Sequence, residues 1–298
     1  MTLMISDRFL KNIGEKPILL VGPTASGKSK IAMSLAMKLG RHIVNADSLQ
    51  VYSNWRILTA RPTIKDEEII PHHLYGHKAP NEEYSVGHWL RELSNILSTN
   101  KKLIIVGGTG LYFSALTEGL ANIPKISDET KIISEKRLLK YGIQELLNDL
   151  DKETRESIDI KNPMRVIRAW EVLKETGKSL KKWQSETDPP ILPLTKCQPL
   201  VINPDKNDLN KKIRARFKEM IEMGALDEAK KNLDMWNKGV IANKAIGASE
   251  LISYLKNEIS LDEAITNASI ATRQYAKRQR TWIKARMKQW DDVTELIG

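Results

Sequence analysis

The stretch Gly22-Pro23-Thr24-Ala25-Ser26-Gly27-Lys28-Ser29 decides the fold of this chain, because it matches the phosphate-loop pattern G-x-x-x-x-G-K-[ST] at every fixed position. An apolar run, residues 18–21, precedes it, and residues 30–39 follow with helical periodicity, so the loop joins a strand to a helix. Glycines let the backbone N–H groups turn inward, and the helix N-terminus adds partial positive charge. We expect Lys28 to contact phosphate and the Ser29 hydroxyl to ligate Mg²⁺.

The loop alone leaves the reaction open, since kinases, ATPases and pyrophosphate-releasing transferases all use such a loop. A glycine-rich turn that binds nothing is a further alternative. An ordinary ATPase would carry a Walker-B aspartate near the end of the apolar run at residues 103–106. The sequence has none there, which disfavours an ATPase.

Composition indicates a globular protein with a polyanionic partner. The chain has 298 residues, about two domains, and a 41% hydrophobic content that is enough for a packed core. Its formal net charge of +10 favours a polyanion. The single cysteine, Cys197, excludes an internal disulfide and a cysteine-based zinc site. Residues 1–17 have no continuous apolar segment, and no run is long enough to cross a bilayer, so we expect a cytoplasmic protein without a membrane partner.

Short apolar runs alternate with helical stretches in the first part of the chain, at residues 18–21, 42–45 and 103–106. This alternation is typical of βαβ units and a parallel sheet. Together with the loop, it predicts an α/β fold with a P-loop NTPase-like parallel sheet core flanked by helices.

The remainder of the chain is mainly helical in pattern. Residues 123–195 are charged and lack a strong strand, residues 199–203 resemble a returning strand, and everything after Asp208 is helical in pattern. We therefore expect the first part of the core at residues 1–120, an all-helical insertion domain at 121–195, and a returning strand with basic C-terminal helices at 196–298. No dimerisation signal is visible, and we expect a monomer.

Two further strands end in turns that should lie beside the phosphate loop, because ligands of open α/β sheets bind outside the carboxyl ends of the strands. Asp47 follows residues 42–45. It could hold Mg²⁺, activate a hydroxyl or accept a proton from an amine, or it could merely cap a helix. Gly107-Gly108-Thr109-Gly110 follows residues 103–106 and favours close approach of backbone to a ligand, with a tight turn and N-cap as the alternative.

A cationic stripe marks the C-terminal helix expected over residues 272–290. Its members recur at helical spacing with no acidic residue among them: Arg273, Lys277, Arg280, Lys284 and Lys288. We expect this stripe to bind a phosphate backbone, in preference to being a solvated face. The aromatic side chains of the same helix, Tyr275, Trp282 and Trp290, should pack it onto the body of the protein.

Taken together, these motifs resemble the bacterial tRNA dimethylallyltransferases. The resemblance spans nearly the whole chain and rests on residues 22–29, 47–52, 107–112, 165–169 and 272–279. It implies transfer of a dimethylallyl group from dimethylallyl diphosphate to N6 of the adenosine 3′-adjacent to the anticodon, with release of pyrophosphate. A phosphate loop without ATPase machinery is suited to such a leaving group.

The resemblance also implies roles for individual residues. Asp47 would be the general base, Thr109 would lie near the reacting amine, and Lys28 with an arginine would bind the diphosphate. Arg216 is the best match for that arginine, and Arg214 leaves the choice open. Mg²⁺ would be the cofactor, with Ser29 as its ligand.

The anticodon stem-loop of tRNA is the implied partner, and the insertion would close over the anticodon loop. The residues expected to contact tRNA are Asp47, Ser48, Leu49, Gln50, Met164, Arg165, Arg168, Lys244, Arg273, Lys277 and Arg280. Arg165 and Arg168 share one helix face, which suits phosphate contact. Alternatively, they pair at the surface with Glu171 or Glu175.

Some positions depart from the family pattern. Residues 244–250 replace an Arg-x-x-Gly-Tyr stretch found in many relatives, so its tyrosine contact cannot be transferred to this chain. Arg61-Pro62 stands where relatives usually have Lys-Pro, which keeps the charge and changes the geometry. His72-His73 does not predict a metal site, because adjacent side chains point in different directions and no third ligand is near.

Three other functions remain as alternatives. A P-loop small-molecule kinase would use the same loop with ATP, and it gives no role to the cationic stripe. A non-catalytic RNA-binding NTPase would need a water-positioning acid after Val106. An AMP isopentenyltransferase would share the loop and the base and should lack a long helical insertion and a basic C-terminal arm.

Overall fold

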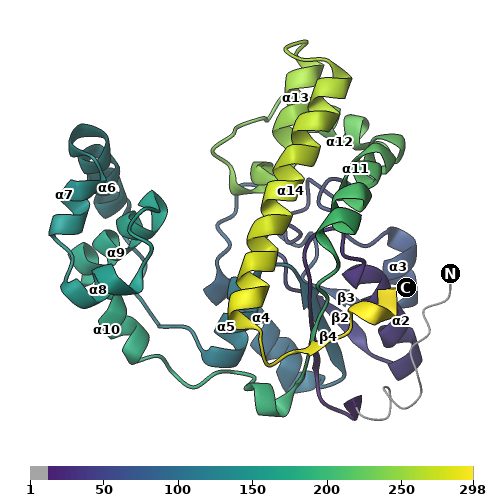
Figure 1. The fold of residues 1–298 in the computed structure, drawn as a ribbon, viewed down its shortest axis with the longest axis horizontal. Helices are drawn as coiled ribbons and strands as arrows, with labels where there is room; N and C mark the ends of the chain where they lie inside the picture. Colours follow the sequence, from purple (N-terminus) through teal and green to yellow (C-terminus); the bar gives the residue numbers. More distant parts are fainter. Residues whose placement is uncertain (1–12, 298) are drawn as a thin grey trace. The chain divides into compact units, whose positions relative to one another are not determined.

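The computed structural model describes residues 13–297 of the chain. The expectation that residues 1–17 contain no leader segment concerns mainly residues 1–12, which lie outside the described part of the chain. The chain divides into two compact units (Figure 1). Unit 1 comprises the chain up to Thr117 and from Leu192 onward, and unit 2 comprises Glu118–Ile191. The insertion domain expected from the sequence was residues 121–195, so its expected bounds differ from those of unit 2 by a few residues at each end. None of the helices in residues 13–297 has the length and apolar character that a membrane span requires.

Unit 1 is built on a parallel sheet of six strands in the order β3-β2-β4-β1-β5-β6. The strand bounds are β1 Ile18–Val21, β2 His42–Asn45, β3 His72–His73, β4 Leu103–Gly107, β5 Gln198–Val201 and β6 Asp291–Asp292. The central strand β1 pairs with β4 on one side and β5 on the other, and all of its residues are buried. The α/β fold with a parallel core sheet is confirmed.

Helices cover both faces of this sheet. The helices of unit 1 are α2 Lys28–Leu39, α3 Ile64–Ile69, α4 Val86–Thr99, α5 Gly110–Glu118, α11 Lys206–Glu222, α12 Ala225–Lys231, α13 Ala248–Leu255 and α14 Leu261–Arg286, with 3-10 turns η1 Leu194–Lys196, η2 Ile241–Lys244 and η3 Thr294–Ile297. Ile31 and Leu35 of α2 pack in one core cluster with Ile18 and Leu20 of β1. Successive strand residues face opposite sides, so Leu19 points to the other face.

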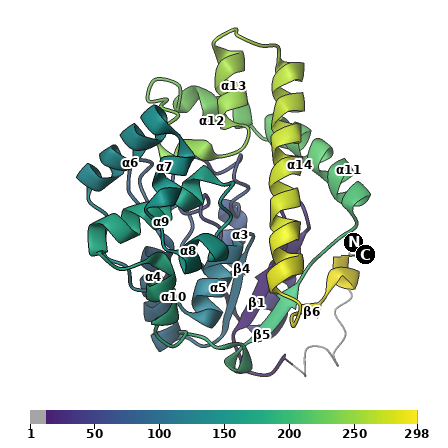
Figure 2. The ribbon, with the colours of Figure 1, turned by 60° about the vertical axis from the view of Figure 1, so that its left-hand side comes forward.

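The C-terminal helices form a second core in unit 1. Figure 2 shows α13 and α14 side by side, with α11 next to α14. Trp55, in the long connection after β2, is fully buried in the same cluster as Phe217 of α11, Leu251 of α13 and Ala268 of α14. This packing fixes α11 and α14 relative to the loops at the carboxyl ends of the strands.

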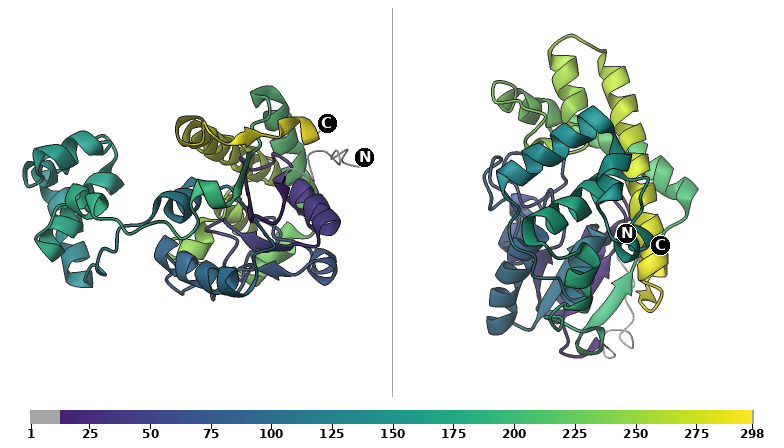
Figure 3. Two further views of the ribbon diagram at one scale, coloured as in Figure 1. Left: turned by 90° about the horizontal axis from the view of Figure 1, so that it is seen from below. Right: turned by 90° about the vertical axis from the view of Figure 1, so that its left-hand side faces the viewer.

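Unit 2 is all-helical (Figure 3), and it has a small hydrophobic core of its own. Its helices are α6 Asp128–Tyr141, α7 Ile143–Asn148, α8 Lys152–Ser157, α9 Pro163–Thr176 and α10 Leu180–Ser185. Trp170 of α9 is buried, and its indole N–H donates to Asp149 at 2.7 Å. Arg137 of α6 donates to the same carboxylate at 2.8 Å. The Asp149 carboxylate therefore links α6, α9 and the end of α7.

Strand β3 was not predicted from the sequence, and two expectations for the C-terminal region are wrong. His72–His73 and Asp291–Asp292 are short strands at the two edges of the sheet, and neither has the apolar pattern that marks the inner strands. The last helix ends at Arg286, with Met287 as its C-cap, so Lys288 does not continue the stripe on α14. Each of these two-residue edge strands is defined by its pairing with β2 or β5, and sequence periodicity cannot show such pairing.

Candidate active site

The phosphate loop occupies the turn between β1 and α2. Gly27 is the N-cap of α2 and has φ 86°, a left-handed conformation that favours glycine. Ala25 also has a positive φ of 60°, which is uncommon for a residue with a Cβ. The Lys28 ammonium donates to the carbonyl oxygen of Pro23 at 3.3 Å. The loop thus curls back over its own lysine, as an anion-binding turn does.

Ser26 of this loop carries a buried polar group without a protein partner. Its side chain is 1% exposed, and its Oγ makes no hydrogen bond in the structure. Gly22 lies so close that a Cβ there would come within 2.8 Å of this Oγ. A buried hydroxyl without a partner costs free energy. An anion in the loop would provide the missing acceptor, and the donor set therefore fits a phosphate group.

A cavity of about 80 Å³ opens directly beside the loop. It is lined by Thr24, Ala25, Lys28, Ser29, Asp47, Leu49, Gln50, Leu58, Thr59, Ile213, Arg216, Phe217, Met220, Ala245, Ile246, Thr272 and Tyr275. The lining combines cations next to the phosphate loop with apolar side chains of α11. Such a site can hold a molecule that has an anionic end and an apolar end.

Lys28, Asp47 and Arg216 influence one another across this cavity. Burial lowers the pKa of Lys28 to about 8; the carboxylate of Asp47 opposes this shift, and the guanidinium of Arg216 adds to it. Burial also lowers the pKa of Arg216 from its ordinary value. Two partly buried cations near one carboxylate form a net positive site. An anion bound there would stabilise both cations.

Arg216 and Arg214 differ in position on α11. Arg216 is partly buried and lines the cavity, whereas Arg214 is exposed and is not among the lining residues. Residues 213, 216, 217 and 220 all lie on the cavity side of the helix, at the spacing of one helix face. Arg216 is therefore the arginine of the pair that can reach a ligand in the cavity.

Asp47 lies in a tight turn at the carboxyl end of β2. Its backbone N–H donates to Oδ1 of Asn45 at 2.8 Å, and its own Oδ1 accepts from the N–H of Leu49 at 3.0 Å. No helix begins here, since the next one starts at Ile64, so Asp47 does not cap a helix. The turn holds one carboxylate oxygen, and the residue lines the cavity.

Thr109 does not line the cavity. Its Oγ1 accepts the N–H of Ser48 at 3.1 Å. Tyr275 of α14 is within hydrogen-bonding reach of Thr109 and lines the cavity. Thr109 is thus joined both to the turn that carries Asp47 and to α14.

The glycines around Thr109 make room for protein, which differs from the close approach to a ligand that we expected. A Cβ on Gly107 would lie 2.0 Å from the carbonyl oxygen of Ala46. A Cβ on Gly108 would lie 2.1 Å from Nε2 of Gln279, and one on Gly110 would lie 2.1 Å from the ring of Trp282. The spacing of glycines cannot distinguish a ligand from packed protein; here the neighbour of Gly107 is the backbone after β2, and the neighbour of Gly108 and Gly110 is α14.

The aromatic residues of the C-terminal region behave differently from one another. Trp282 packs on Gly110, and Trp290 packs edge-on against Phe113 at a centroid distance of 5.6 Å, as expected for body packing. Tyr275 lines the cavity, so its role is wider than the packing that we expected. Burial raises the pKa of the Tyr275 hydroxyl, with the charge of Asp47 as the second cause.

The candidate tRNA-contacting residues of unit 1 fall into two groups. Asp47, Leu49 and Gln50 line the cavity, next to Ser48 in the same turn. The amide of Gln50 donates to the carbonyl oxygen of Thr59 at 2.7 Å, which fixes this side chain. The exposed cations are Lys244 at the end of η2 and Arg273, Lys277 and Lys284 on α14. Arg280 is partly buried, and its Nε donates to Oδ1 of Asn203 at 3.4 Å.

The candidate tRNA-contacting residues of unit 2 lie on α9. Met164 is 71% exposed, and Arg165 and Arg168 are exposed one turn apart. Glu171 and Glu175 accept hydrogen bonds elsewhere, from Ser134 and from Ser127 and Thr130 respectively. Glu171 and Glu175 thus serve to join α9 to α6.

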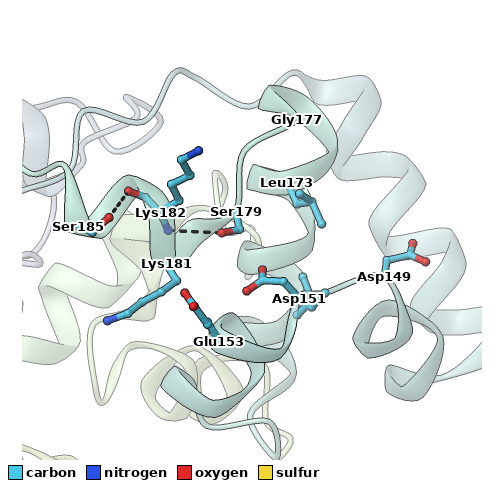
Figure 4. A pocket seen from close by; sticks show the side chains of 10 residues that line it. Asp149, Asp151, Glu153, Leu173, Gly177, Ser179, Lys181, Lys182 and Ser185 are labelled. Carbon is cyan, nitrogen blue, oxygen red and sulfur yellow. Dashed lines mark hydrogen bonds between the residues drawn. The ribbon is translucent and has the colours of Figure 1, made fainter.

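A larger hollow of about 570 Å³ lies within unit 2 (Figure 4). It contains none of the loops at the ends of the sheet strands. Its polar side chains serve the helices themselves: Asp151 accepts the N–H of Thr154 at 2.8 Å, and Ser179 accepts the N–H of Lys182 at 3.3 Å. Although this hollow is larger, we place the candidate active site in unit 1.

Arg61, which departs from the family pattern, and His73 both have structural contacts. Arg61 donates to the carbonyl oxygens of Tyr52 and Ser53, each at 3.2 Å, and covers Gly76, where a Cβ would lie 1.9 Å from its guanidinium. His73 lies on edge strand β3, and its Nε2 is 3.0 Å from Nδ1 of His42. Within residues 13–297, no group of His, Cys, Asp and Glu side chains could form a metal site.

Gln279 is a site-adjacent residue that sequence reasoning did not single out. It is 7% exposed, and its amide joins the phosphate loop to the turn after β4. A polar residue at a helical position between charged neighbours gives no periodic signal of its own. Its i, i+4 relation to Tyr275 on the face opposite the cations could have indicated a polar inner face.

Comparison with known proteins shows similarity over almost the whole chain. The sequence model of the IPP transferase family matches residues 50–286, and that of the isopentenyl transferases matches residues 16–70. A tRNA dimethylallyltransferase of Cereibacter sphaeroides is 50% identical over 279 residues, covering 94% of this chain and 89% of that protein. The protein of the same name from Dinoroseobacter shibae is 50% identical over 283 residues, covering 94% and 95%.

Solved structures agree with this similarity. A full-length tRNA isopentenylpyrophosphate transferase from Bacillus halodurans has 32% sequence identity and a TM-score of 0.65, covering 93% of this chain and 90% of that one. A eukaryotic dimethylallyltransferase acting on tRNA has 26% identity and a TM-score of 0.79, covering 95% and 75%. Both similarities extend through both units of the chain.

Proposed function

This chain belongs to the IPP transferase family, and we propose that it transfers a dimethylallyl group from dimethylallyl diphosphate to tRNA. The names of its similar relatives support this proposal. The acceptor is N6 of the adenosine 3′-adjacent to the anticodon, and pyrophosphate leaves. The observation that carries the proposal is one cavity that brings together Lys28, Arg216 and Asp47 at the carboxyl ends of β1 and β2.

The leaving group would be held by the phosphate loop. As the allylic C–O bond breaks, its electron pair stays on the diphosphate, whose charge rises. Lys28, Arg216 and residues of the loop line the cavity, and the N–H groups of such a loop bind phosphate. Fixed cations stabilise the transition state more than the ground state when charge develops beside them. The apolar side of the cavity, with Ile213 and Phe217, suits the dimethylallyl group.

The acceptor amine would be activated by Asp47. The C–N bond forms from the N6 lone pair to the carbon that leaves the diphosphate, and the excess proton passes to the Asp47 carboxylate. This carboxylate has one oxygen fixed by the N–H of Leu49 at 3.0 Å, so the group is oriented before substrate arrives. Thr109 acts through the Ser48 N–H that it holds at 3.1 Å, which keeps the Asp47 turn in place.

Mg²⁺ is the proposed cofactor, and Ser29 is its proposed protein ligand. Ser29 lines the same cavity as Lys28. The unpartnered Ser26 Oγ supports binding of an anion in the loop, and a bound diphosphate would supply further oxygen ligands to Mg²⁺. Mg²⁺ commonly takes most of its ligands from substrate phosphates and water. When bound, it would supply positive charge to the diphosphate.

The target base has to leave its stack to reach this cavity, at a cost of a few kcal/mol. Contacts to the RNA backbone would offset that cost. The exposed cations that would make them are Lys244, Arg273 and Lys277 in unit 1, and Arg165 and Arg168 in unit 2. Arg280 would contribute less, because it already donates to Asn203.

Other functions fit the residues less well. A small-molecule kinase would have no use for the exposed cations of α14, and it would place a second phosphate site where Ile213 and Phe217 form an apolar wall. An AMP isopentenyltransferase would need neither unit 2 nor the basic face of α14. A non-catalytic NTPase would need an acid after β4, where Gly107 and Gly108 stand.

The decisive experiment incubates the protein with labelled dimethylallyl diphosphate and Mg²⁺ and offers unmodified tRNA, AMP or neither. We expect label in tRNA only, with pyrophosphate released in equal amount. Label in AMP without label in tRNA would favour the AMP enzyme. ATP turnover without transfer of the label would favour a kinase.

We also propose that the protein acts as a monomer in the cytoplasm. The dimethylallyl-transferring site would be formed within unit 1 of a single chain. Light scattering at micromolar concentration tests the first point, because a dimer would double the mass of 33.8 kDa.

A further inference from the structure

Helix α14 carries the polar side chains of Tyr275 and Gln279 on its inner side, in addition to the cations on its outer side. Tyr275 and Gln279 are four residues apart and lie on one side of the helix, whereas Arg273 and Lys277 lie on the opposite side. Gln279 is 7% exposed, and Arg273 and Lys277 are exposed. A buried amide inside a helix is costly unless its hydrogen bonds are made.

Gln279 makes hydrogen bonds to two different loops of the site. Its Oε1 accepts the backbone N–H of Thr24, in the phosphate loop, at 2.8 Å. Its Nε2 donates to the backbone carbonyl oxygen of Gly108, in the turn after β4, at 2.9 Å. One side chain therefore bridges segments that follow β1 and β4, which are neighbours in the sheet.

The glycine at position 108 is what allows this bridge. A Cβ at Gly108 would lie 2.1 Å from Nε2 of Gln279, a distance at which the amide could not remain. The backbone of the phosphate loop is also close, because the same Cβ would be 3.2 Å from the carbonyl oxygen of Gly22. The three segments are packed so closely that a shift of α14 would move both loops.

Tyr275 extends this bridge toward the turn that contains Asp47. It lines the cavity and is within hydrogen-bonding reach of both Gln279 and Thr109. Thr109 in turn accepts the N–H of Ser48, which follows Asp47. A continuous chain of contacts thus runs from the phosphate loop, through α14, to the turn that carries the proposed base.

We propose that Gln279 is a positioning residue that holds the phosphate loop in its anion-binding shape and in fixed relation to the Asp47 turn. This inference rests on the proposed function for its catalytic consequence, since the diphosphate is the ligand of that loop. It does not rest on that function for binding of a phosphate compound, which the loop geometry supports by itself.

The test uses two replacements of Gln279 in the full-length protein. Gln279→Met removes both hydrogen bonds and keeps the volume. Gln279→Glu keeps the acceptor for the Thr24 N–H and replaces the donor to Gly108 with an oxygen that is repelled by the Gly108 carbonyl. Gln274→Met on the exposed side of the same helix is the matched control.

The first measurement is the Kd for inorganic pyrophosphate, with the Kd for tRNA in parallel. We expect Gln279→Met to weaken pyrophosphate binding about tenfold, since two hydrogen bonds that shape the loop are lost. The tRNA Kd should change less than about twofold, because the cationic face of α14 is untouched. Gln274→Met should leave both values unchanged.

The second measurement separates positioning from mere structural support. The carboxyl group that Gln279→Glu introduces can again donate to the Gly108 carbonyl once it is protonated. The transfer rate of Gln279→Glu relative to the unmodified protein should therefore rise as pH falls. Thermal unfolding at each pH shows whether the variants are folded. A packing role alone would lower the Tm and leave this ratio independent of pH.

The outcomes distinguish this inference from the proposed function. If pyrophosphate binding is the same in Gln279→Met and Gln274→Met while both are folded, the positioning role is wrong. If pyrophosphate binding weakens as expected but the unmodified protein transfers no label to tRNA, the proposed function fails and the positioning role stands.

Discussion

The Lys28 ammonium group donates a hydrogen bond to the carbonyl oxygen of Pro23, 3.3 Å away within the same phosphate loop. Burial lowers the pKa of this lysine to about 8. Its charge is therefore lost within the mildly alkaline range unless an anion is bound. The affinity of the loop for phosphate should therefore depend on pH, because it depends on the charge of Lys28.

Pyrophosphate affinity should fall as pH rises above about 8, where Lys28 becomes neutral in the free protein. Binding must then also protonate the lysine, which costs about tenfold in affinity for each pH unit. Titration calorimetry from about pH 7 to about pH 9.5 spans this transition. Lys28→Arg stays charged throughout and corrects for the ionisation of pyrophosphate itself. Equal pH dependence in the two proteins would contradict the lowered pKa.

Removal of the Lys28 charge should stabilise the protein at neutral pH. The pKa of Lys28 is about 8 in the folded state and 10.5 in the reference state, so folding disfavours its charged form. The penalty is fully present below about pH 8 and disappears as pH rises toward 10.5. Lys28→Met should therefore raise the Tm at about pH 7 and should raise it less at about pH 10. Lys30→Met, at an exposed neighbour, should have little effect at either pH.

The two arginines of α11 should differ sharply in function. Arg216 lines the cavity, and a charged hydrogen bond to a bound anion contributes about 1.5 to 3 kcal/mol. Arg216→Ala should accordingly raise the KM for dimethylallyl diphosphate about tenfold to hundredfold in steady-state kinetics. Arg214→Ala changes an exposed residue of the same helix and should stay near the unmodified value. The reverse order would show that Arg214 binds the diphosphate.

Asp47→Asn should abolish most transfer without disturbing binding. Asparagine keeps an Oδ1 that can accept the Leu49 N–H, so the turn is retained. It cannot take the proton of the amine, and general-base catalysis contributes about a hundredfold to ten-thousandfold. Single-turnover transfer measures the loss, and filter binding measures the tRNA Kd. Asp262→Asn, in the first turn of α14, is the control. Near-normal turnover in Asp47→Asn would exclude Asp47 as the base.

The exposed cations of α14 should determine the salt dependence of tRNA binding. Lys277→Gln removes an exposed charge and should reduce the slope of log Kd against log salt by roughly one for each lost phosphate contact. Lys230→Gln is the control, because Lys230 already lies 3.7 Å from Asp227 on α12. An unchanged slope in Lys277→Gln would mean that this face of α14 does not contact the RNA backbone.

Local signals in the sequence were sufficient for the elements with strong periodicity. The run before Gly22 and the runs at residues 42–45 and 103–106 predict β1, β2 and β4 because inner strands of a parallel sheet are buried on both faces. The edge strands β3 and β6 have no such burial, and their residues read as polar. The family resemblance also follows from the sequence, since its motifs keep their order over nearly the whole chain.

The arrangement of the site depended on contacts between segments distant in the chain. Residue spacing identifies Asp47, Lys28 and the pair Arg214 and Arg216, and it places none of them relative to the others. Packing of α11 turns Arg216 into the cavity and leaves Arg214 outside. Packing of α14 explains why Gly108 and Gly110 are glycines, and it brings in Gln279 from 255 residues beyond Thr24.

By itself, the sequence determined the phosphate loop, the parallel core, the family and the net positive charge, because each depends on a local pattern or on composition. Only the tertiary structure decided which arginine faces the cavity, that Asp47 caps no helix, and that the glycines after β4 admit a helix. Those outcomes depend on which surfaces are buried against each other, and burial is a property of the folded chain as a whole.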